Sequence, residues 1–508
     1  MYRLSFEDVQ SILINSNQLR ETVHSDKWYY EVKDKKLLNK TFDAITYNSK
    51  EVSHGSLFIC KGETFKVDYL KEAVNQGVQF YISENYYEDV DATGFIVNDI
   101  REVMALIARE FYGRPDEKIK VIGITGTKGK TTTTYLLKNI LDTYKPEKTA
   151  VISTIEIILD GKNAVRSSLT TPEAMDLFQM IAQAHDNGME YLVMEVSSQA
   201  YKMKRVYGMT FDVGAFLNIS PDHIGPNEHP NAEDYFYCKS RLMLNSKVSV
   251  LHSSLDHLDY LKELSDTASY KSILYGPDTD INDYTYKKSD DDRRQFQITS
   301  EDADPLQLNG EYKINMLGDF NKENALCAAI AASTLGVDQA SIQKGIAQTS
   351  VPGRMEHFTY GTNEIYIDFA HNYISLKTLF DYVVAEHPDH DLTIVLGAPG
   401  NKGLSRRKDM GEILSAYQGR VILTEDDPNR EVVRNISEEI AKYIDGPIQV
   451  LFNDSREEAI RSILNDLKPE DNQVIVLAAK GSDRFILRHG VKEDYIGDDG
   501  LVKQFLDQ

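Results

Sequence analysis

The sequence has 508 residues, a formal net charge of −23 at pH 7 and a hydrophobic fraction of 41%. Because phosphate backbones require a basic protein face, this acidity argues against a nucleic-acid partner, and without a long apolar run or an apolar N-terminal segment we expect no membrane span and no signal peptide. The length predicts about three domains, since one domain usually takes roughly 100–200 residues.

The first predicted domain covers residues 1–115, mixes strands with helices and ends at the break Gly113-Arg114-Pro115. The second covers residues 116–351. Within it, segments 118–125, 190–194 and 212–217 are predicted as buried strands, and segment 131–144 as a helix. This alternation is typical of a mainly parallel sheet, whose ligands lie at the carboxyl ends of the strands.

Residues 278–305 are polar and acidic and are predicted as exposed β-hairpins or loops. A break at Val351-Pro352-Gly353-Arg354 starts the third domain, residues 352–508. There, 393–396, 421–424 and 474–477 read as strands separated by helices such as 436–444.

The sequence therefore predicts an α/β fold with three domains. The first is a mixed α/β unit, the second a central P-loop ATPase-like parallel sheet, and the third a doubly wound, Rossmann-like domain. Cys60, Cys238 and Cys327 are too far apart for a disulfide framework or a zinc motif, which favours the reduced cytoplasm.

The most informative segment joins the strand 118–125 to the helix 131–144. It predicts a short phosphate-binding loop made of Gly126, Thr127, Lys128, Gly129, Lys130 and Thr131. Glycines let backbone N–H groups face a phosphate at a helix N-terminus, Lys130 supplies a point charge, and Thr131 offers a hydroxyl to magnesium. The common loop has four residues between its glycines and this one has two. The alternative is an ordinary glycine turn before a helix.

Three polar residues downstream are candidates for the same site. Glu195 ends an apolar strand, where a carboxylate can reach magnesium held by nucleotide phosphates. His223 follows another strand end and is a candidate ligand of a second metal, although a single histidine is more often a packing residue. Lys239 lies on a predicted helix and by itself reads as a surface lysine.

Six segments, in this order, resemble the Mur ligase family over nearly the whole chain: Thr125–Thr132, Glu195–Ser198, Asn218–His223, Asn321–Asn324, Pro352–Glu356 and Asp368–His371. The resemblance implies that Thr131, Glu195 and His223 hold magnesium, with two ions bound. It also implies that Asn321, Arg354 and Asp368 contact ATP. Lys239 matches the family's carbamylated lysine, in which carbon dioxide converts the amine to an anionic oxygen ligand.

Within the family, the chain is most similar to the members that extend UDP-N-acetylmuramoyl-L-alanyl-D-glutamate (the UDP-MurNAc-dipeptide). Ser49 matches their uridine-binding segment, and Thr170, Thr171, Ser197 and Arg205 match the dipeptide site. An alternative role coexists, because Thr171 before Pro172 is also a good helix start.

The added amino acid is predicted from Asp426, Asp427, Pro428 and Asn429. Relatives that add meso-diaminopimelate carry Asp-Asn-Pro-Arg here, and their arginine grips a second carboxylate that lysine lacks. The acidic side chains favour a cationic substrate, so the pattern predicts L-lysine. If Arg430 took the arginine's role, the predicted substrate would be diaminopimelate instead. Ornithine, one methylene shorter than lysine, is also an alternative substrate.

The resemblance implies two further contacts to the added amino acid, at positions where this chain has a different residue from most relatives. Lys402 stands where relatives usually have an arginine for the α-carboxylate, and Asp483 stands in Lys-Gly-Ser-Asp where many have Lys-Gly-His-Glu. Lysine can form that ion pair but not a bidentate one.

The resemblance implies an ATP-dependent ligase that joins L-lysine to the D-glutamate carboxylate through an acyl phosphate. We expect a cytoplasmic monomer of peptidoglycan precursor synthesis. One alternative is a folylpolyglutamate synthase, which lacks the N-terminal unit. Another is a non-catalytic paralogue that binds the nucleotide sugar. Loss of a catalytic residue would have supported it, but the sequence retains Lys130, Glu195, His223 and Lys239.

Overall fold

The computed structural model describes residues 2–62, 65–220, 224–225, 228–268, 271–277, 281–289, 292–300, 304–316 and 318–507. The chain forms two compact units. The first contains residues 1–314 and 319–349, and the second contains residues 315–318 and 350–508. The expected boundary after residue 115 lies inside the first unit, so the division into 1–115, 116–351 and 352–508 stays a prediction.

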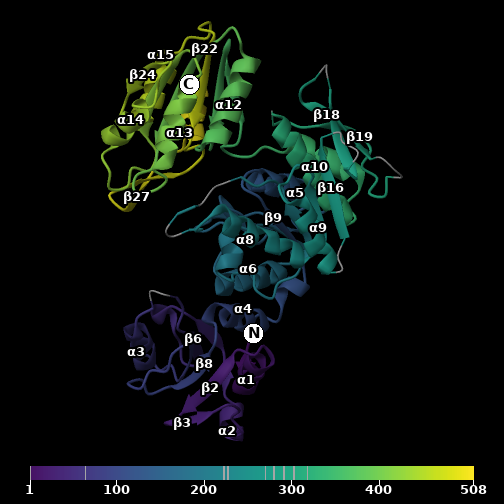
Figure 1. The fold of residues 1–508 in the computed structure, drawn as a ribbon, viewed down its shortest axis with the longest axis vertical. Helices are drawn as coiled ribbons and strands as arrows, with labels where there is room; N and C mark the ends of the chain where they lie inside the picture. Colours follow the sequence, from purple (N-terminus) through teal and green to yellow (C-terminus); the bar gives the residue numbers. More distant parts are fainter. Residues whose placement is uncertain are drawn as a thin grey trace. The chain divides into compact units, whose positions relative to one another are not determined.

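The N-terminal part of the first unit is built on a mixed sheet (Figure 1). Its strand order is β3 (Lys27–Tyr29), β2 (Leu19–His24), β8 (Thr93–Val97), β7 (Phe80–Ser83), β6 (Ser56–Ile59) and β5 (Ala44–Thr46). The pairs from β8 to β5 are parallel, and β2 is antiparallel to both of its neighbours. Around it lie β1 (Leu4–Ser5), β4 (Thr41–Phe42), α1 (Phe6–Asn15), α2 (Lys35–Leu38), η1 (Ser49–Glu51), α3 (Val67–Asn75) and α4 (Ile100–Phe111).

A larger sheet follows in the same unit. Its strand order is β12 (Ala164–Arg166), β11 (Glu156–Ile158), β10 (Thr149–Ile152), β13 (Tyr191–Glu195), β9 (Lys120–Thr125), β14 (Phe211–Phe216), β15 (Ser246–His252), β16 (Lys271–Pro277), β17 (Tyr284–Lys288), β18 (Gln295–Ser300) and β19 (Gly310–Lys313). Strands β10 to β17 in this order pair in parallel, and antiparallel strands extend both edges.

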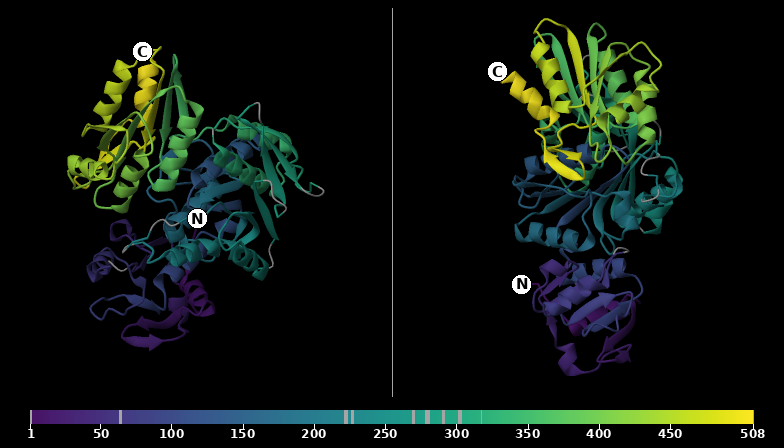
Figure 2. Two further views of the ribbon diagram at one scale, coloured as in Figure 1. Left: turned by 45° about the horizontal axis from the view of Figure 1, so that its top comes forward. Right: turned by 90° about the vertical axis from the view of Figure 1, so that its left-hand side faces the viewer.

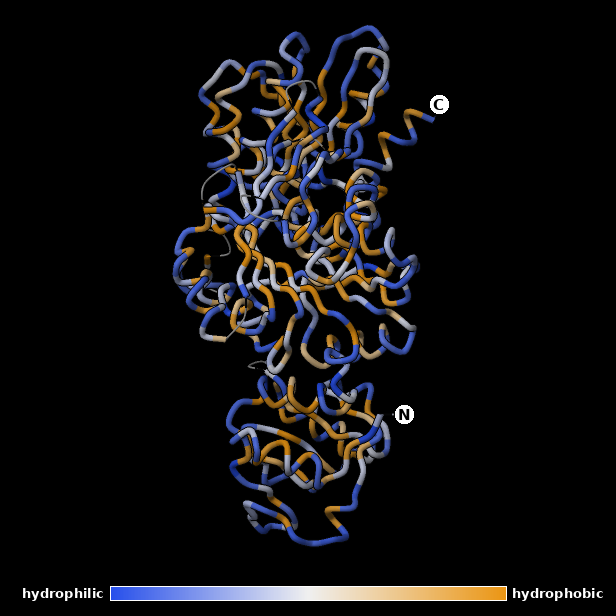
Figure 3. The backbone as a smooth tube through the Cα atoms, turned by 90° about the vertical axis from the view of Figure 1, so that its right-hand side faces the viewer, coloured by the Kyte–Doolittle hydropathy of each residue, from blue (hydrophilic) through white to orange (hydrophobic). Residues whose placement is uncertain are grey.

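Helices cover both faces of this sheet. They are η2 (Pro115–Glu117), α5 (Lys130–Tyr144), α6 (Ala174–Asp186), α7 (Ser198–Lys202), α8 (Ala232–Leu244), α9 (Leu258–Thr267), α10 (Asp319–Thr334) and α11 (Gln339–Gln348). Strand β9 is buried on both faces, as the apolar side chains of Val121, Ile122 and Ile124 require. In Figure 3 hydrophobic stretches run through the interior while many outer turns are hydrophilic.

The two parts of the first unit share one hydrophobic core. Val103 and Ile107 of α4 belong to the same buried cluster as Phe178 and Ile181 of α6. Figure 2 shows the N-terminal part as a purple group beside the blue central helices. Since the two helices bury apolar surface against each other, the N-terminal part is packed onto the central part and is not merely tethered to it.

The second unit is a doubly wound α/β body. Its sheet has the order β20 (Glu356–Tyr360), β21 (Asn363–Asp368), β25 (Gln473–Ala478), β22 (Asp391–Ala398), β23 (Arg420–Glu425) and β24 (Gln449–Phe452), parallel except for β20. The other elements are α12 (Tyr373–Glu386), α13 (Ser405–Leu414), α14 (Val433–Ala441), α15 (Arg456–Asp466), α16 (Asp498–Leu506) and the hairpin β26 (Phe485–Arg488)–β27 (Val491–Asp494).

Alternation along β22 explains why both faces of this sheet carry helices. Ile394 and Leu396 point into one buried cluster with α12, α13 and α14, whereas Val395 joins the opposite cluster with α15 and α16. A strand with both faces apolar needs two helical layers. The predicted α/β fold class and the doubly wound C-terminal domain are thus confirmed.

The predicted elements occur with small shifts. Segment 118–125 begins two residues later as β9, helix 131–144 begins at Lys130, and helix 436–444 corresponds to α14. In the polar segment 278–305, β17 and β18 form an antiparallel hairpin on the edge of the central sheet. Tyr284 and Tyr286 of β17 are buried, so this hairpin is less exposed than the composition predicts. Within the described ranges, no helix has the length and apolar character to cross a bilayer.

Candidate active site

The loop after β9 connects it to α5 at the carboxyl edge of the central sheet. Gly129 caps α5 with a φ of +84°, a left-handed conformation that glycine adopts without strain. A Cβ at this position would lie 2.5 Å from Asn324 Oδ1 of α10. The Lys130 ammonium donates to the carbonyls of Gly126 and Thr127, 2.8 and 3.2 Å away, and so folds back over the loop.

The chain after β14 braces this loop. The Thr127 and Lys128 amides donate to the Asn218 carbonyl (3.0 Å) and to Asn218 Oδ1 (2.8 Å), and the Asn218 amide group donates to the Lys128 carbonyl. Strands β13 and β14 flank β9 in parallel, so their carboxyl ends must lie beside the loop.

Helix α8 supplies a buried lysine to the same loop. Lys239 is 2% exposed, and its ammonium donates to the Gly126 carbonyl at 2.9 Å and lies 4.8 Å from the centroid of the Tyr235 ring. The Tyr235 hydroxyl donates to Thr127 Oγ1 at 3.3 Å. Lys239 is therefore not the solvated surface lysine that its helix alone would suggest.

Glu195, at the end of β13, is completely buried and surrounded by hydroxyl groups. Its carboxylate accepts from Thr131 Oγ1 at 2.8 Å and from the Thr154 amide and hydroxyl at 3.1 and 2.9 Å. Among the residues that the structure describes, no lysine or arginine forms an ion pair with it. A buried carboxylate among neutral oxygen donors, next to a phosphate-binding loop, has the oxygen-rich surroundings that magnesium prefers.

The segment expected to bind the dipeptide lies next to Glu195. The Thr171 hydroxyl donates to the Glu195 carbonyl at 2.9 Å and accepts from the Ser197 amide at 3.1 Å. Thr170 Oγ1 and Thr154 Oγ1 are 3.0 Å apart. The predicted N-cap role of Thr171 is not seen, because α6 begins later, after Glu173.

Arg205 reaches the same segment from beyond α7. Its guanidinium donates to the Thr171 carbonyl at 3.0 Å and to Glu173 Oε1 at 2.6 Å, while Lys61 of the N-terminal part lies 2.6 Å from Glu173 Oε2. Burial raises the pKa of Glu173, but the two cations overcome this and hold it below its ordinary value. Arg205 and Lys61 thus both pair with the Glu173 carboxylate, and Asp176 is a second carboxylate close to Lys61.

The predicted uridine contact lies in η1. Ser49 is buried, and its hydroxyl donates to Glu72 Oε2 of α3 at 2.7 Å. Asn48, the N-cap, accepts from the Lys50 amide. Helix α10 places Asn321, also buried, one turn from the Asn324 side chain that faces Gly129.

In the second unit, Arg354 and Asp368 come together around the start of β20. The Asp368 carboxylate accepts from the Met355 and Ala370 amides at 2.8 and 2.7 Å, and the Arg354 guanidinium lies 4.8 Å from the Phe369 ring centroid. Both residues are partly buried.

The acidic segment after β23 surrounds a buried lysine that the sequence analysis did not select. Lys480 Nζ lies 2.7 Å from Asp427, 3.4 Å from Asp483 and 3.6 Å from Asp426. Burial lowers the pKa of Lys480, but the carboxylates raise it above its ordinary value. Burial raises the pKa of Asp426 to about 6, although the Lys480 charge opposes the shift. The sequence did contain a clue to Lys480, because this lysine begins the segment Lys-Gly-Ser-Asp from which Asp483 was predicted.

The segment Pro428-Asn429 is held in place by its backbone. Asn429 has a φ of +53°, its amide donates to the Leu487 carbonyl at 2.8 Å, and its carbonyl accepts from the His489 amide at 2.5 Å. Gly400 donates to the Asp427 carbonyl at 2.8 Å, which brings the loop containing exposed Lys402 beside this segment.

The structure thus gathers most predicted residues into two groups, one in each unit. The first group contains the loop 126–131, Glu195, Lys239, Thr170, Thr171, Ser197, Arg205 and Asn321. The second contains two separate sets of residues. One set is Arg354 and Asp368, and the other is Lys402, Asp426, Asp427, Pro428, Asn429 and Asp483. Ser49 belongs to the N-terminal part, and His223 lies outside the described residues. Sequence reasoning missed Thr154, Lys61, Glu173, His229 and Lys480, whose contacts were found only in the tertiary structure.

A glycine-rich loop at a strand–helix junction, bordered by a buried carboxylate and two lysines, defines a P-loop protein that handles phosphate groups. Two family models match the chain: the Mur ligase middle domain over residues 124–332, and the Mur ligase glutamate ligase domain over residues 353–481. The chain belongs to the Mur ligase family, and like its members it is an ATP-dependent ligase.

Curated relatives match almost the full length. The UDP-N-acetylmuramoyl-L-alanyl-D-glutamate--L-lysine ligase of Enterococcus faecalis is 44% identical and covers 99% of both chains. The ligase of the same name from Streptococcus thermophilus is 42% identical over 99% of this chain and 100% of its own.

Solved structures match in fold. A UDP-N-acetylmuramoyl-L-alanyl-D-glutamate--2,6-diaminopimelate ligase has a TM-score of 0.68 at 21% identity, covering 100% of this chain and 99% of its own. The MurF ligase from Thermotoga maritima in complex with ADP has a TM-score of 0.58 at 20% identity, covering 91% and 97%. These similarities establish the fold and not the substrate.

Proposed function

We propose that this chain adds L-lysine to the D-glutamate carboxylate of UDP-N-acetylmuramoyl-L-alanyl-D-glutamate with hydrolysis of ATP. The observation that carries the proposal is the full-length similarity to ligases of that name. The segment Asp426-Asp427-Pro428-Asn429 supports it through the family resemblance, which implies an arginine in place of Asn429 for diaminopimelate. The reaction serves peptidoglycan precursor synthesis. The cytoplasm and a monomeric state stay predictions.

The chemistry is phosphoryl transfer followed by amide formation. The D-glutamate carboxylate attacks the γ-phosphorus of ATP, which gives an acyl phosphate and ADP. The amine of lysine then attacks the acyl carbon and releases phosphate. The carboxylate and the phosphates repel each other, so the site must lower this repulsion.

Lys130 and the first turn of α5 hold the phosphates, together with Gly126, Thr127, Lys128, Gly129 and Thr131. Lys130 donates hydrogen bonds to the loop carbonyls, and a phosphate would replace them as acceptor. Asn321 lies beside the loop. Arg354 and Asp368 contribute to ATP binding from the second unit.

The residues around Glu195 fit magnesium. Its buried carboxylate and the hydroxyls of Thr131 and Thr154 are hard oxygen donors, and Lys239, once carbamylated, adds another. When bound, two magnesium ions would neutralise the phosphate oxygens and the attacking carboxylate. His223 completes the proposed ligand set.

Substrate recognition divides between the units. Ser49 contacts the uridine, and Thr170, Thr171, Ser197 and Arg205 hold the dipeptide. The incoming lysine is held by Lys402 at its carboxylate and by the acidic group of Asp426, Asp427 and Asp483 near its ammonium. Pro428 and Asn429 shape the end of that pocket.

The decisive test follows lysine incorporation directly. The full chain is incubated with ATP, Mg²⁺, the UDP-linked dipeptide and one amino acid at a time: L-lysine, L-ornithine or meso-diaminopimelate. We expect phosphate release and a UDP-linked tripeptide with lysine. Activity with diaminopimelate and none with lysine would overturn the specificity, and binding of the nucleotide sugar without turnover would favour a non-catalytic paralogue.

A further inference from the structure

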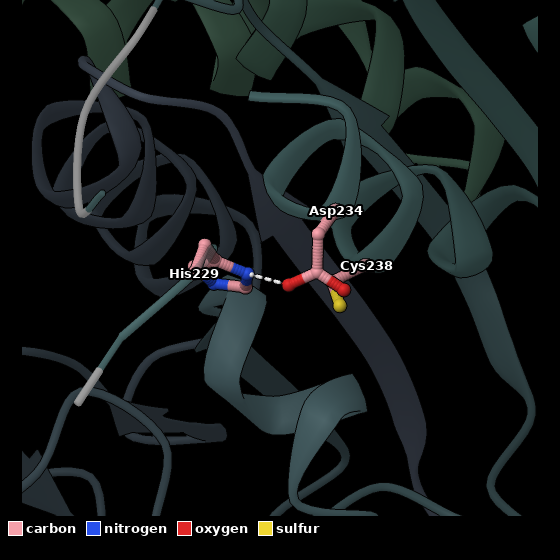
Figure 4. Close-up of side chains that lie close together, drawn as sticks. All are labelled: His229, Asp234 and Cys238. Carbon is pink, nitrogen blue, oxygen red and sulfur yellow. Dashed lines mark hydrogen bonds and ion pairs between the residues drawn. The ribbon is translucent and has the colours of Figure 1, made fainter. Parts of the chain in front are cut away.

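A buried histidine outside the predicted site connects two of its elements. His229 is completely buried, with Nδ1 2.6 Å from Asp234 Oδ2 and Nε2 2.8 Å from Ser198 Oγ. Figure 4 shows the imidazole pointing at the Asp234 carboxylate, with Cys238 behind it. Asp234 is on α8, and Ser198 directly follows the turn that contains Glu195 and Ser197.

The protonation pattern of this group follows from Asp234. Burial raises the pKa of Asp234, but hydrogen bonds from Lys202 and His229 outweigh burial and lower it. An ionised carboxylate only accepts, so Nδ1–H of His229 donates to it. In the neutral ring, Nε2 then accepts from the Ser198 hydroxyl.

Two other functions for the group are excluded by its surroundings. The serine, histidine and aspartate resemble a nucleophilic triad, but Ser198 is only 4% exposed and no substrate carbonyl can approach it. His229, Asp234 and Cys238 could also hold a metal ion. However, Lys202 already pairs with Asp234 at 2.9 Å, and burial raises the pKa of the Cys238 thiol to about 11, so the donor set is poor.

The group instead links α8 to the turn that contains Glu195. We call this link, made by His229 with Ser198, Asp234 and Tyr235, the clamp. The Tyr235 ring packs edge-on against His229 with centroids 5.2 Å apart, and that same ring lies under the Lys239 ammonium. The Tyr235 hydroxyl reaches Thr127 of the phosphate loop. His229 therefore contacts one neighbour of Glu195 on one side and the helix of Lys239 on the other.

We propose that His229 is a positioning residue of the magnesium site: by joining Ser198 to Asp234 and Tyr235, it fixes the separation between Glu195 and Lys239. This inference rests on the proposed function, in which those two side chains belong to the same magnesium site. A ligand pair held at the right spacing binds the ion more tightly, because little freedom is lost on binding.

The test uses two substitutions that keep different halves of the clamp. Asparagine can donate at the place of Nδ1 and keeps the Asp234 bond, whereas glutamine reaches the place of Nε2 and keeps the Ser198 bond. We expect His229→Leu and His229→Asn to raise the Mg²⁺ concentration for half-maximal velocity about tenfold, since a buried hydroxyl is left unsatisfied. His229→Gln breaks the other half of the clamp, the bond to Asp234, and should raise this concentration as well.

A second readout does not depend on turnover. Titration of Mg²⁺ with ADP into the full chain, followed by calorimetry, should show the same order of affinities, and Ser198→Ala should behave like His229→Asn. His185→Leu is the matched control, because His185 also lies beside an aspartate but is only partly buried.

The outcomes separate the explanations. If Ser198→Ala and His229→Leu lower the thermal midpoint but leave Mg²⁺ affinity within about twofold, the role is merely structural and the proposal is wrong. Should the unaltered protein fail to use lysine, the calorimetric comparison still decides whether His229 positions the magnesium site.

Discussion

At the scale of single residues, the chemistry depends on side chains whose environment differs from what their type suggests. Glu195 is a fully buried carboxylate with hydroxyl and amide donors around it, and Lys239 is a buried lysine on an otherwise ordinary helix. Burial of a charge is unfavourable unless a partner compensates it. In the proposed reaction these partners are the cations and phosphates of the substrates.

Replacing Glu195 with glutamine tests the carboxylate without changing the shape of the site. The amide can keep hydrogen bonds to Thr154 but loses the negative charge, so we expect kcat to fall about 10²–10³-fold. Glu156→Gln is the control, because Glu156 accepts from the Tyr135 hydroxyl at 2.7 Å and belongs to no proposed ligand set. Steady-state phosphate release measures both, and equal effects in the two variants would contradict the assignment of Glu195.

Asp426 leads to a prediction about pH. Its folded-state pKa is raised to about 6, chiefly by burial, against an ordinary value of 3.8. Between these values the folded state binds more protons than the unfolded state, so the contribution of Asp426 to stability falls as pH rises from about 4 to about 6.

Asp426→Asn cannot titrate and should gain stability relative to the unaltered chain over that window, by about 1–3 kcal/mol. The thermal midpoints of both proteins, compared at pH 4, 5, 6 and 7, measure this difference. A constant difference across the series would contradict the raised pKa.

At the scale of elements, turns with left-handed backbone decide where functional loops can be. Gly129 caps α5 beside Asn324, and Asn429 sits between the hairpin β26–β27 and the end of β23. At each position the backbone has a positive φ and other atoms lie close by. A substitution there is therefore limited both by backbone conformation and by the space available for a side chain.

Gly129→Ala should lower the affinity for ADP at least about tenfold, because a Cβ adds a clash with Asn324 to the backbone strain. Gly336 is a matched control, since its φ is +87° and a Cβ there would meet nothing within 4 Å. Gly336→Ala should cost about 1–2 kcal/mol of stability and leave ADP binding unchanged. Calorimetric titration and thermal unfolding distinguish the two.

Asn429→Arg tests specificity at the turn. An arginine would bring a positive charge towards the ammonium of lysine and would be strained at a φ of +53°, so kcat/KM for lysine should fall at least about tenfold. Asn472→Arg, at an exposed position with a φ of +56°, controls for strain alone. Unchanged lysine use in Asn429→Arg would remove this residue from the specificity argument.

At the scale of the whole molecule, the proposed ATP and amino-acid residues belong to two units of one chain. Thr349 is fixed in the first unit through bonds to Gly345 and Asn139, whereas Gly353 is fixed in the second through Glu356 and Phe369. We expect hinges at the breaks around Pro115 and Pro352, and at the second of these breaks residues 350–352 lie between the two anchored positions.

Closure about this hinge is expected when all substrates are bound. The radius of gyration from small-angle scattering should decrease when a non-hydrolysable ATP analogue, Mg²⁺, the UDP-linked dipeptide and lysine are added together, because closure excludes water from the reacting groups. UMP alone is the control and should leave it unchanged. An identical radius with all substrates present would contradict closure.

Local patterns of apolar residues and glycine were sufficient to predict the fold class, the position of β9 and α5, and the phosphate loop between them. The sequence also indicated the family through six ordered segments. Three features became evident only in the folded chain: Lys239 is buried against Gly126, Thr154 and Thr131 surround Glu195, and Lys480 lies among three aspartates. Apart from Lys480–Asp483, these contacts join residues 41 to 113 positions apart. Their energies come from burial and charge in the folded chain, which no local pattern encodes.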